Sequence, residues 1–190
     1  MRKLALHLAT VLALVAATTL IFSSPASAYR DPGWPSPNGT SPWLYSESWF
    51  ISGSWYNEGY HTETYNDYYA IDFANPYGGC WRNLYAYWNG MTVTYVNHDI
   101  GSLYMTKSID GWQYRVKYLH MAQINVAVGN VVGTNTLVGY SGTKGNSTGC
   151  HLHLSVHRYH PETGWWHSIE PMFCGRTYPH DHVTWFPGCP

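Results

Sequence analysis

The sequence carries little charge. Only 11% of its 190 residues are charged, against about a quarter in an ordinary soluble domain, and the formal net charge is −1. A near-neutral chain without a basic patch does not suit a nucleic-acid partner. Aromatic residues make up 17% of the chain, and disorder requires few aromatics together with high net charge. The composition therefore predicts a compact, aromatic-rich globular protein.

The sequence also lacks an amphipathic pattern long enough to predict a helix of about ten residues. Short runs of β-branched and aromatic residues instead alternate with Gly, Asn and Asp between residues 54 and 171. Examples are Tyr69–Phe73, Met91–Val96, Tyr114–Leu119 and His151–His157. We therefore expect a mainly β fold, a small antiparallel β-sheet with a loop-rich arm and tail.

The first 28 residues have the pattern of a signal peptide. Arg2 and Lys3 precede an apolar run over residues 4–22, and a small-residue cleavage site follows at 26–28. A membrane anchor is the alternative, because this run approaches the ~20 residues that span a bilayer. His7 within the run and the lack of stop-transfer charges after it favour a cleaved signal. We expect a secreted protein with no membrane segment after cleavage.

The rest of the chain divides into three parts by composition. Residues 29–53 are rich in Pro, Gly, Ser and Trp and form an N-terminal arm, 54–172 form the main domain, and 173–190 form a tail with Pro and His. Three tryptophans of this arm and one just after it either pack in the core or stack on sugar rings and line a substrate groove. These are Trp34, Trp43, Trp49 and Trp55.

No C-x-x-C spacing occurs among the four cysteines, so thiolate metal ligation is not favoured. All four lie in the exported part, and an even number there predicts two disulfides. Three pairings are open. We prefer Cys174 with Cys189, which would tie down the tail and leave Cys80 with Cys150.

Histidine is the residue in surplus, with 11 copies, as many as Asp and Glu together. His151 and His153 alternate with Leu152 and Leu154, so in a strand the two imidazoles project from one face while the leucines turn to the core. Imidazole suits zinc, which in catalytic sites takes three protein ligands and leaves one position for water. The pair alone is a weak signal and needs a third ligand.

Two other patterns are less favoured. Gly145–Gly149 matches the G-x-S-x-G nucleophile elbow around Ser147, but that motif needs a following helix, and a strand-like run follows here. His180 and His182 form a second H-x-H in a Pro-flanked tail without a partner motif, so a second metal site there is not favoured. Four further histidines are expected at the surface: His98, His157, His160 and His167.

Several separated motifs together resemble the M23 family of zinc metallopeptidases. The run Gly145-Asn-Ser-Thr-Gly-Cys-His-Leu-His-Leu154 is similar to the family's G-N-S-T-G-P-H-L-H-F signature. Upstream, residues 59–61 and 69–73 resemble the motifs carrying the family's first His and its Asp, and 118–121 resembles its Y-x-H-L element. The resemblance spans residues 59–171 and implies a small antiparallel sheet with a metal in a groove across it.

The resemblance also implies the site residues. His61, Asp72 and His153 would bind one zinc ion, two imidazoles and one carboxylate. His151 would take the proton from the zinc-bound water, and His120 would orient that water or stabilise the oxyanion. The sequence leaves open how His151 and His120 divide these roles.

Two departures from the family pattern bear on the site. The interval from His61 to Asp72 is longer than the family's common H-x-x-x-D and is closest to the β-lytic branch, which makes Asp67 a rival ligand. Cys150 replaces the usual Pro, so a disulfide would hold the strand end there, or a free thiol would lie near the zinc.

The function implied is that of a secreted, monomeric zinc endopeptidase. Its substrates would be the cross-bridges or stem peptides of bacterial peptidoglycan, or other Gly-rich peptides, cut beside Gly or D-Ala. The main alternative is a non-catalytic zinc-binding module that recognises wall peptides or a protein partner. Another zinc hydrolase of the wall is a third alternative, although the E-x-x-H element of D,D-carboxypeptidases is missing.

Overall fold

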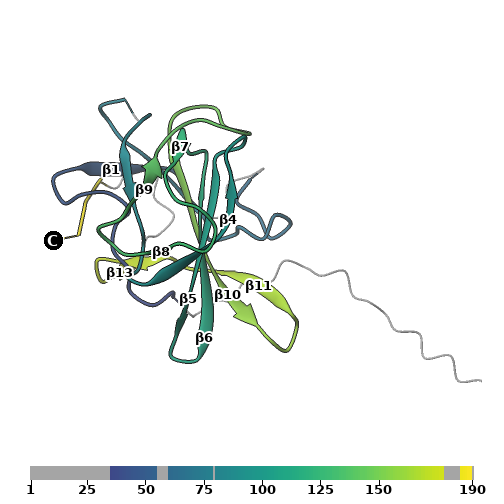
Figure 1. The fold of residues 1–190 in the computed structure, drawn as a ribbon. Coiled ribbons are helices and arrows are strands. Elements are labelled where there is room, and N and C mark those ends of the chain that lie inside the picture. Colours follow the sequence, from purple (N-terminus) through teal and green to yellow (C-terminus); the bar gives the residue numbers. More distant parts are fainter. Residues whose placement is uncertain (1–34, 55–59, 79, 178–184, 190) are drawn as a thin grey trace, which may run out of the picture.

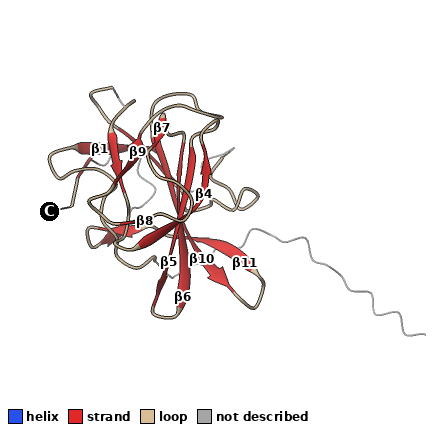
Figure 2. Ribbon diagram, viewed as in Figure 1, coloured by secondary structure: helices blue, strands red, loops and turns tan. Residues whose placement is uncertain are grey.

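The computed structural model describes residues 35–54, 60–78, 80–177 and 185–189, and this part of the chain consists of β-strands and loops without a helix (Figure 2). The strands are β1 (Ser48–Gly53), β2 (Ile71–Ala74), β3 (Asn83–Tyr85), β4 (Met91–Asn97), β5 (Ser102–Ile109), β6 (Trp112–Leu119), β7 (Gln123–Ile124), β8 (Val131–Val132), β9 (Leu137–Tyr140), β10 (Leu152–His160), β11 (Trp165–Ile169), β12 (Met172–Phe173), β13 (Arg176–Thr177) and β14 (Trp185–Pro187). All pairings between these strands are antiparallel, which confirms the predicted fold class.

The main sheet has the order β14-β1-β2-β10-β6-β5-β4-β8, with β11 paired to β10 outside this path (Figure 1). Two small sheets, β12-β13 and β3-β9-β7, pack around it. Strand β10 lies in the middle, and almost all of its residues are buried. Side chains on both faces of β10 are therefore shielded from water, including its polar side chains.

The hairpin of β5 and β6 fixes the position of the chain that leaves β6. Asp110 and Gly111 connect the two strands with φ angles of 50° and 81°, the left-handed pair that a tight two-residue hairpin turn requires. The register runs without a shift from Ile109 opposite Trp112 to Leu103 opposite Tyr118. An uninterrupted ladder therefore holds the end of β6 beside β10.

Part of the predicted arm belongs to the main sheet. Residues 48–53 form β1, which lies between β14 and β2. Trp43 and Trp49 are 2% and 0% exposed and stack with ring centroids 5.1 Å apart, so these two serve the core and are not available to a sugar. Trp34 and Trp55 lie outside the described residues.

Two disulfides fasten the periphery. Cys80 is bonded to Cys150 and Cys174 to Cys189, the pairing that we preferred, and the described chain has no free cysteine. The first bridge ties the residue before His151 to the segment that leads into β3. The bridge also removes the free thiol that Cys150 would otherwise place beside the site.

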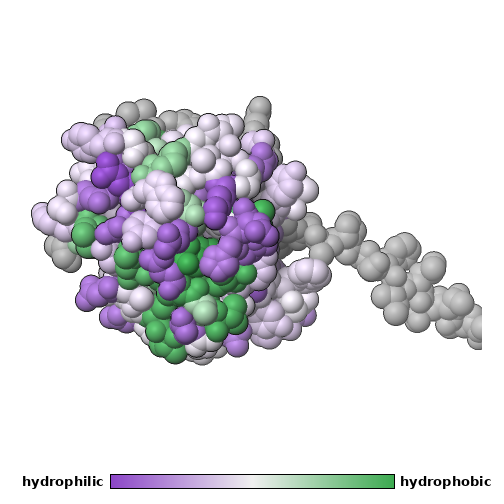
Figure 3. Space-filling model, turned by 45° about the horizontal axis from the view of Figure 1, so that its top comes forward, coloured by the Kyte–Doolittle hydropathy of each residue, from purple (hydrophilic) through white to green (hydrophobic). Residues whose placement is uncertain are grey.

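Three of the four histidines expected at the surface are buried instead. His157, His160 and His167 are 0%, 9% and 6% exposed, and only His98 is exposed as predicted. The reason is that β10 and β11 pack into the sheet on both faces, which the polar composition of these strands does not reveal. Figure 3 shows a face on which strongly hydrophilic and pale residues surround a hydrophobic area at the lower centre.

The proposed signal peptide and the pair His180 and His182 lie outside the described residues. Within the described residues, no helix has the length and apolar character needed to cross a bilayer.

Candidate metal centre and catalytic groove

The candidate site lies across three neighbouring strands of the main sheet. His153 of β10 faces Asp72 of β2 on one side and Leu119 of β6 on the other. His120 directly follows β6, and His151 directly precedes β10. His61 comes from the loop between β1 and β2. All five residues that the sequence nominated are thus brought together.

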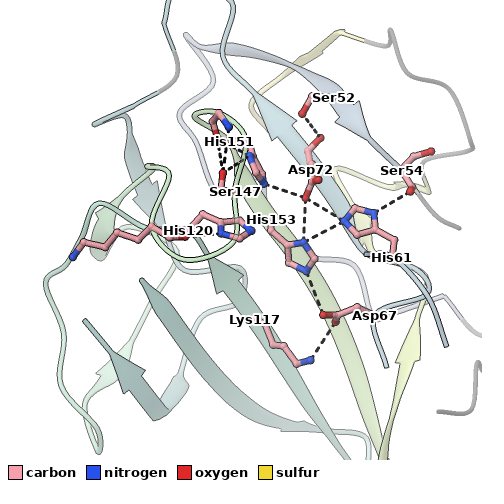
Figure 4. Close-up of polar contacts among 12 residues, drawn as sticks. Ser52, Ser54, His61, Asp67, Asp72, Lys117, His120, Ser147, His151 and His153 are labelled. Atoms are coloured by element: carbon pink, nitrogen blue, oxygen red, sulfur yellow. Dashed lines mark hydrogen bonds and ion pairs between the residues drawn. The ribbon is translucent and has the colours of Figure 1, made fainter. Parts of the chain in front are cut away.

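Three of them present ligand atoms at the corners of a small triangle (Figure 4). His61 Nε2 lies 3.2 Å from His153 Nδ1 and 3.3 Å from Asp72 Oδ1, and His153 Nδ1 lies 3.1 Å from Asp72 Oδ1. In a tetrahedral zinc site with bonds of about 2.1 Å, ligand atoms lie about 3.4 Å apart. The triangle therefore has the size and donor set that a zinc ion requires.

The outward nitrogen of each histidine in the triangle also faces an acceptor. His61 Nδ1 donates to the backbone carbonyl of Ser54 at 2.9 Å, which leaves the lone pair of Nε2 directed into the triangle. His153 Nε2 lies 3.5 Å from Asp67 Oδ2, while its Nδ1 points into the triangle. Such contacts select the tautomer that a metal needs.

The carboxylate of Asp72 is held in its ionised form. Burial alone would raise the pKa of Asp72, but hydrogen bonds from His153 and His61 outweigh burial and hold it far below its ordinary value. In turn, burial would lower the pKa of His153, and the carboxylates of Asp67 and Asp72 raise it to about 9. A metal at Nδ1 must therefore displace a proton from this nitrogen.

His151 borders the triangle without being part of it. Its Nδ1 donates to the carbonyl of Gly149 at 2.9 Å, so its Nε2 carries the lone pair. That Nε2 lies 3.6 Å from Asp72 Oδ1. His151 therefore presents its Nε2 to the edge of the triangle. Ser147, the centre of the G-x-S-x-G pattern, donates its hydroxyl to Gly149 O and precedes a strand rather than a helix.

His120 has the same arrangement of ring nitrogens. Its Nδ1 donates to the carbonyl of Lys144 at 2.8 Å, and Lys144 N returns a hydrogen bond to His120 O. Burial lowers the pKa of His120 to about 4, only partly opposed by the hydrogen bond to Lys144. His120 also has a left-handed φ of 64°, a strained conformation typical of functional sites. At neutral pH its Nε2 is an acceptor.

Asp67, the rival ligand in the sequence, lies on the far side of the His153 ring. It contacts Nε2, the nitrogen that points away from the triangle, and it is not among the three grouped ligands. Its Oδ1 lies 3.2 Å from Lys117 Nζ and 3.3 Å from His157 Nε2. The structure therefore groups Asp72, and not Asp67, with the imidazoles of His61 and His153.

The five histidine and aspartate residues open into a groove of about 420 Å³. Tyr60, Tyr65 and Tyr104 line it together with the loop residues 146–148. Tyr60 and Tyr65 are 59% and 63% exposed, which gives the groove an aromatic border. The sequence did not single out these tyrosines or Lys117, since isolated residues of these types have no characteristic spacing. His157 had a signal, because it continues the period-two series of His151 and His153.

Comparison with known proteins agrees with this geometry. The sequence model of peptidase family M23 matches residues 66–164. The peptidoglycan DD-endopeptidase ShyA of Vibrio cholerae is 33% identical over 87 residues, which are 46% of this chain. The matched part spans 19% of ShyA, well under two thirds of that protein.

Two solved structures have the same fold at a TM-score of 0.51. One is the M23 metalloprotease pseudoalterin from the deep sea, 23% identical, with 64% of this chain and 70% of that chain covered. The other comes from the SpoIIQ–SpoIIIAH pore-forming complex, 20% identical, with 69% of this chain and 87% of that chain covered. At this level of identity the two structures show the fold alone.

Proposed function

The chain belongs to peptidase family M23, and from this premise we propose that it is a zinc-dependent endopeptidase that cleaves peptide bonds of peptidoglycan outside the cytoplasm. The observation that carries the proposal is the ligand triangle of His61, Asp72 and His153 with two basic imidazole nitrogens beside it. Similarity to a peptidoglycan endopeptidase supports the substrate class. Cleavage beside Gly or D-Ala, in cross-bridges or stem peptides, is part of the proposal.

The donor set fits zinc. His61, Asp72 and His153 would hold the ion and leave its fourth position open to the groove. When bound, zinc polarises the scissile carbonyl and lowers the pKa of a bound water to about 7. One carboxylate and two neutral imidazoles leave the ion a net positive charge, which favours this chemistry.

The residues around the ligands supply proton transfer. His151 Nε2 lies at the edge of the triangle with its lone pair free of the backbone, so it accepts the proton of the attacking water. The resulting imidazolium then donates that proton to the leaving amine. Asp72, 3.6 Å away, stabilises the transient positive charge on His151.

His120 acts beside His151, with ring centroids 4.6 Å apart. Its neutral Nε2 accepts a hydrogen bond and therefore orients the water. Stabilising an oxyanion would require a proton on Nε2, and the low pKa of His120 opposes this at neutral pH. The proposed role of His120 is thus that of a water-orienting acceptor.

The exposed tyrosines suit an extended peptide with small side chains. Tyr60 and Tyr65 border the groove without closing it. The two disulfides also suit a protein that works in an oxidising compartment, as does the signal peptide expected in the sequence.

A non-catalytic binding module is the second candidate, because the same fold occurs in a pore-forming complex. The described chain argues against it, since a module that only binds has no use for two uncoordinated histidines held in one tautomer. Purified cell walls treated with the protein, with and without a chelator, separate the two functions. Zinc-dependent loss of turbidity is expected, and His153→Ala is the inactive control.

Mass spectrometry of the released fragments identifies the bond. A new peptide N-terminus is expected. Freed lactyl groups would instead indicate an amidase, and wild type that clears walls no faster than His153→Ala would overturn the peptidase proposal.

A further inference from the structure

Behind His153 lies a buried polar cluster that the zinc chemistry does not require. It comprises Asp67, Lys117 and His157, which are 8%, 9% and 0% exposed. Burying an acid and a base costs free energy unless the two are paired. Lys117 Nζ and Asp67 Oδ1 are paired at 3.2 Å, which offsets this cost (Figure 4).

The sheet register explains how these groups meet. Lys117 of β6 is opposite Ser155, midway between His153 and His157 along β10. Side chains two residues apart share one face of a strand, so His153, Ser155 and His157 all face the loop that carries Asp67. Lys117 reaches Asp67 from the neighbouring strand.

The loop itself is fixed by the residue before Asp67. Asn66 adopts a left-handed φ of 54°. Its carbonyl accepts from His157 Nε2 at 2.6 Å, and its Oδ1 accepts from Ser168 N at 3.2 Å. Both β10 and β11 thus anchor this turn. The position of Asp67 follows from the sheet and not from a mobile loop.

The Nε2 of His153 is fully buried, and no hydrogen bond within ordinary range reaches it from the described residues. The carboxylate of Asp67, 3.5 Å away, is the acceptor that faces it. A buried N–H without an acceptor costs about 1–3 kcal/mol. A metal at Nδ1 requires the proton on Nε2, so metal binding makes this contact obligatory.

We propose that Asp67 is the positioning residue of the metal centre: its carboxylate, held by Lys117, accepts the Nε2 proton of His153 and thereby fixes the tautomer and the ring orientation in which Nδ1 binds zinc. This inference rests on the proposed zinc site. It assigns different tasks to the two carboxylates, with Asp72 on the metal and Asp67 behind the ligand. His61 needs no such acid, because the carbonyl of Ser54 has the equivalent task.

Zinc affinity, measured by competition with a chromophoric chelator, tests the role directly. Asp67→Ala is expected to weaken zinc binding by about 10- to 100-fold, the usual effect of losing such a partner. Asp67→Asn keeps the shape and one weaker acceptor, so it should lose less zinc affinity than Asp67→Ala, although Lys117 loses its ion pair in both variants. Asp99→Asn, an exposed acid, is the matched control and should bind zinc as wild type does.

A spectroscopic signature separates positioning from general destabilisation. In the zinc-loaded wild type, the Nε2–H proton of His153 should give a slowly exchanging NMR resonance, which Asp67→Ala should lose. A zinc affinity of Asp67→Asn and Asp67→Ala within twofold of wild type would overturn the inference.

The outcomes for the proposed function are distinct. Wild type that binds zinc through His153 but clears no walls would overturn the peptidase activity and leave the role of Asp67 intact. Wild type without zinc affinity would overturn both.

Discussion

Gly53 of β1 directly faces Asp72 of β2, and a Cβ atom at position 53 would lie 2.9 Å from Asp72 Oδ2. A side chain there would therefore displace the carboxylate. Strand β1 thus contributes to the proposed metal site by leaving space beside the carboxylate of Asp72.

Gly53→Ala is accordingly expected to weaken zinc binding, by roughly the tenfold that follows when a ligand loses its orientation. Gly149→Ala is the matched control, because its added Cβ meets no atom within 4 Å. Chelator competition measures both variants. Equal affinities for the two would show that the Asp72 carboxylate tolerates the shift.

The two histidines beside the triangle should separate catalysis from metal binding. His151→Ala and His120→Ala are expected to keep zinc affinity, while kcat falls by about 10²- to 10⁴-fold through loss of proton transfer or water orientation. Cleavage of wall peptides with kcat and KM determined separately tests this. The double variant should fall by less than the product of the single effects, because the two residues serve one water. Loss of zinc binding in either variant would instead show that the replaced histidine is a metal ligand.

His157 should make stability fall as the medium is acidified. Burial, followed by the nearby Lys117, lowers the pKa of His157 to about 4 in the folded protein, against about 6.5 for an unperturbed histidine. Because the folded pKa is the lower one, the contribution is fully present above pH 6.5 and is lost as the pH falls toward 4, by at most about 3 kcal/mol.

Urea unfolding of wild type and His157→Gln at a series of pH values measures that contribution. The stability difference between the two proteins should change between pH 6.5 and 4. The exposed His98→Gln variant should follow wild type throughout, and parallel curves for His157→Gln and wild type would contradict the prediction.

The two disulfides should differ in their contribution to stability. The Cys80–Cys150 bridge closes 70 residues and the Cys174–Cys189 bridge closes 15, so chain entropy gives about 4 and about 3 kcal/mol respectively. Paired Cys→Ala variants and chemical unfolding compare them. Loss of the first bridge should also lower activity, because Cys150 precedes His151. Unchanged kcat in that variant would show that β10 alone positions His151.

The sequence by itself determined the fold class, the metal ligands as a hypothesis, and both accessory histidines. Strand periodicity places His151 and His153 on one face, and the resemblance of separated motifs to family M23 nominated His61, Asp72 and His120. Each of these motifs lies within a short stretch of the chain, so it can be recognised in the sequence without knowledge of the fold.

Tertiary structure decided what depended on contacts across strands. The sequence names Asp72 as the ligand with Asp67 as its rival, and only the pairing of β2 with β10 and the packing of the loop against β10 place Asp72 in the triangle and Asp67 behind His153. His157, His160 and His167 looked like surface residues because burial of β10 on both faces depends on its neighbours in the sheet. The same holds for Trp43, Trp49 and Lys117: whether a residue is buried or paired depends on which distant residues the fold brings beside it.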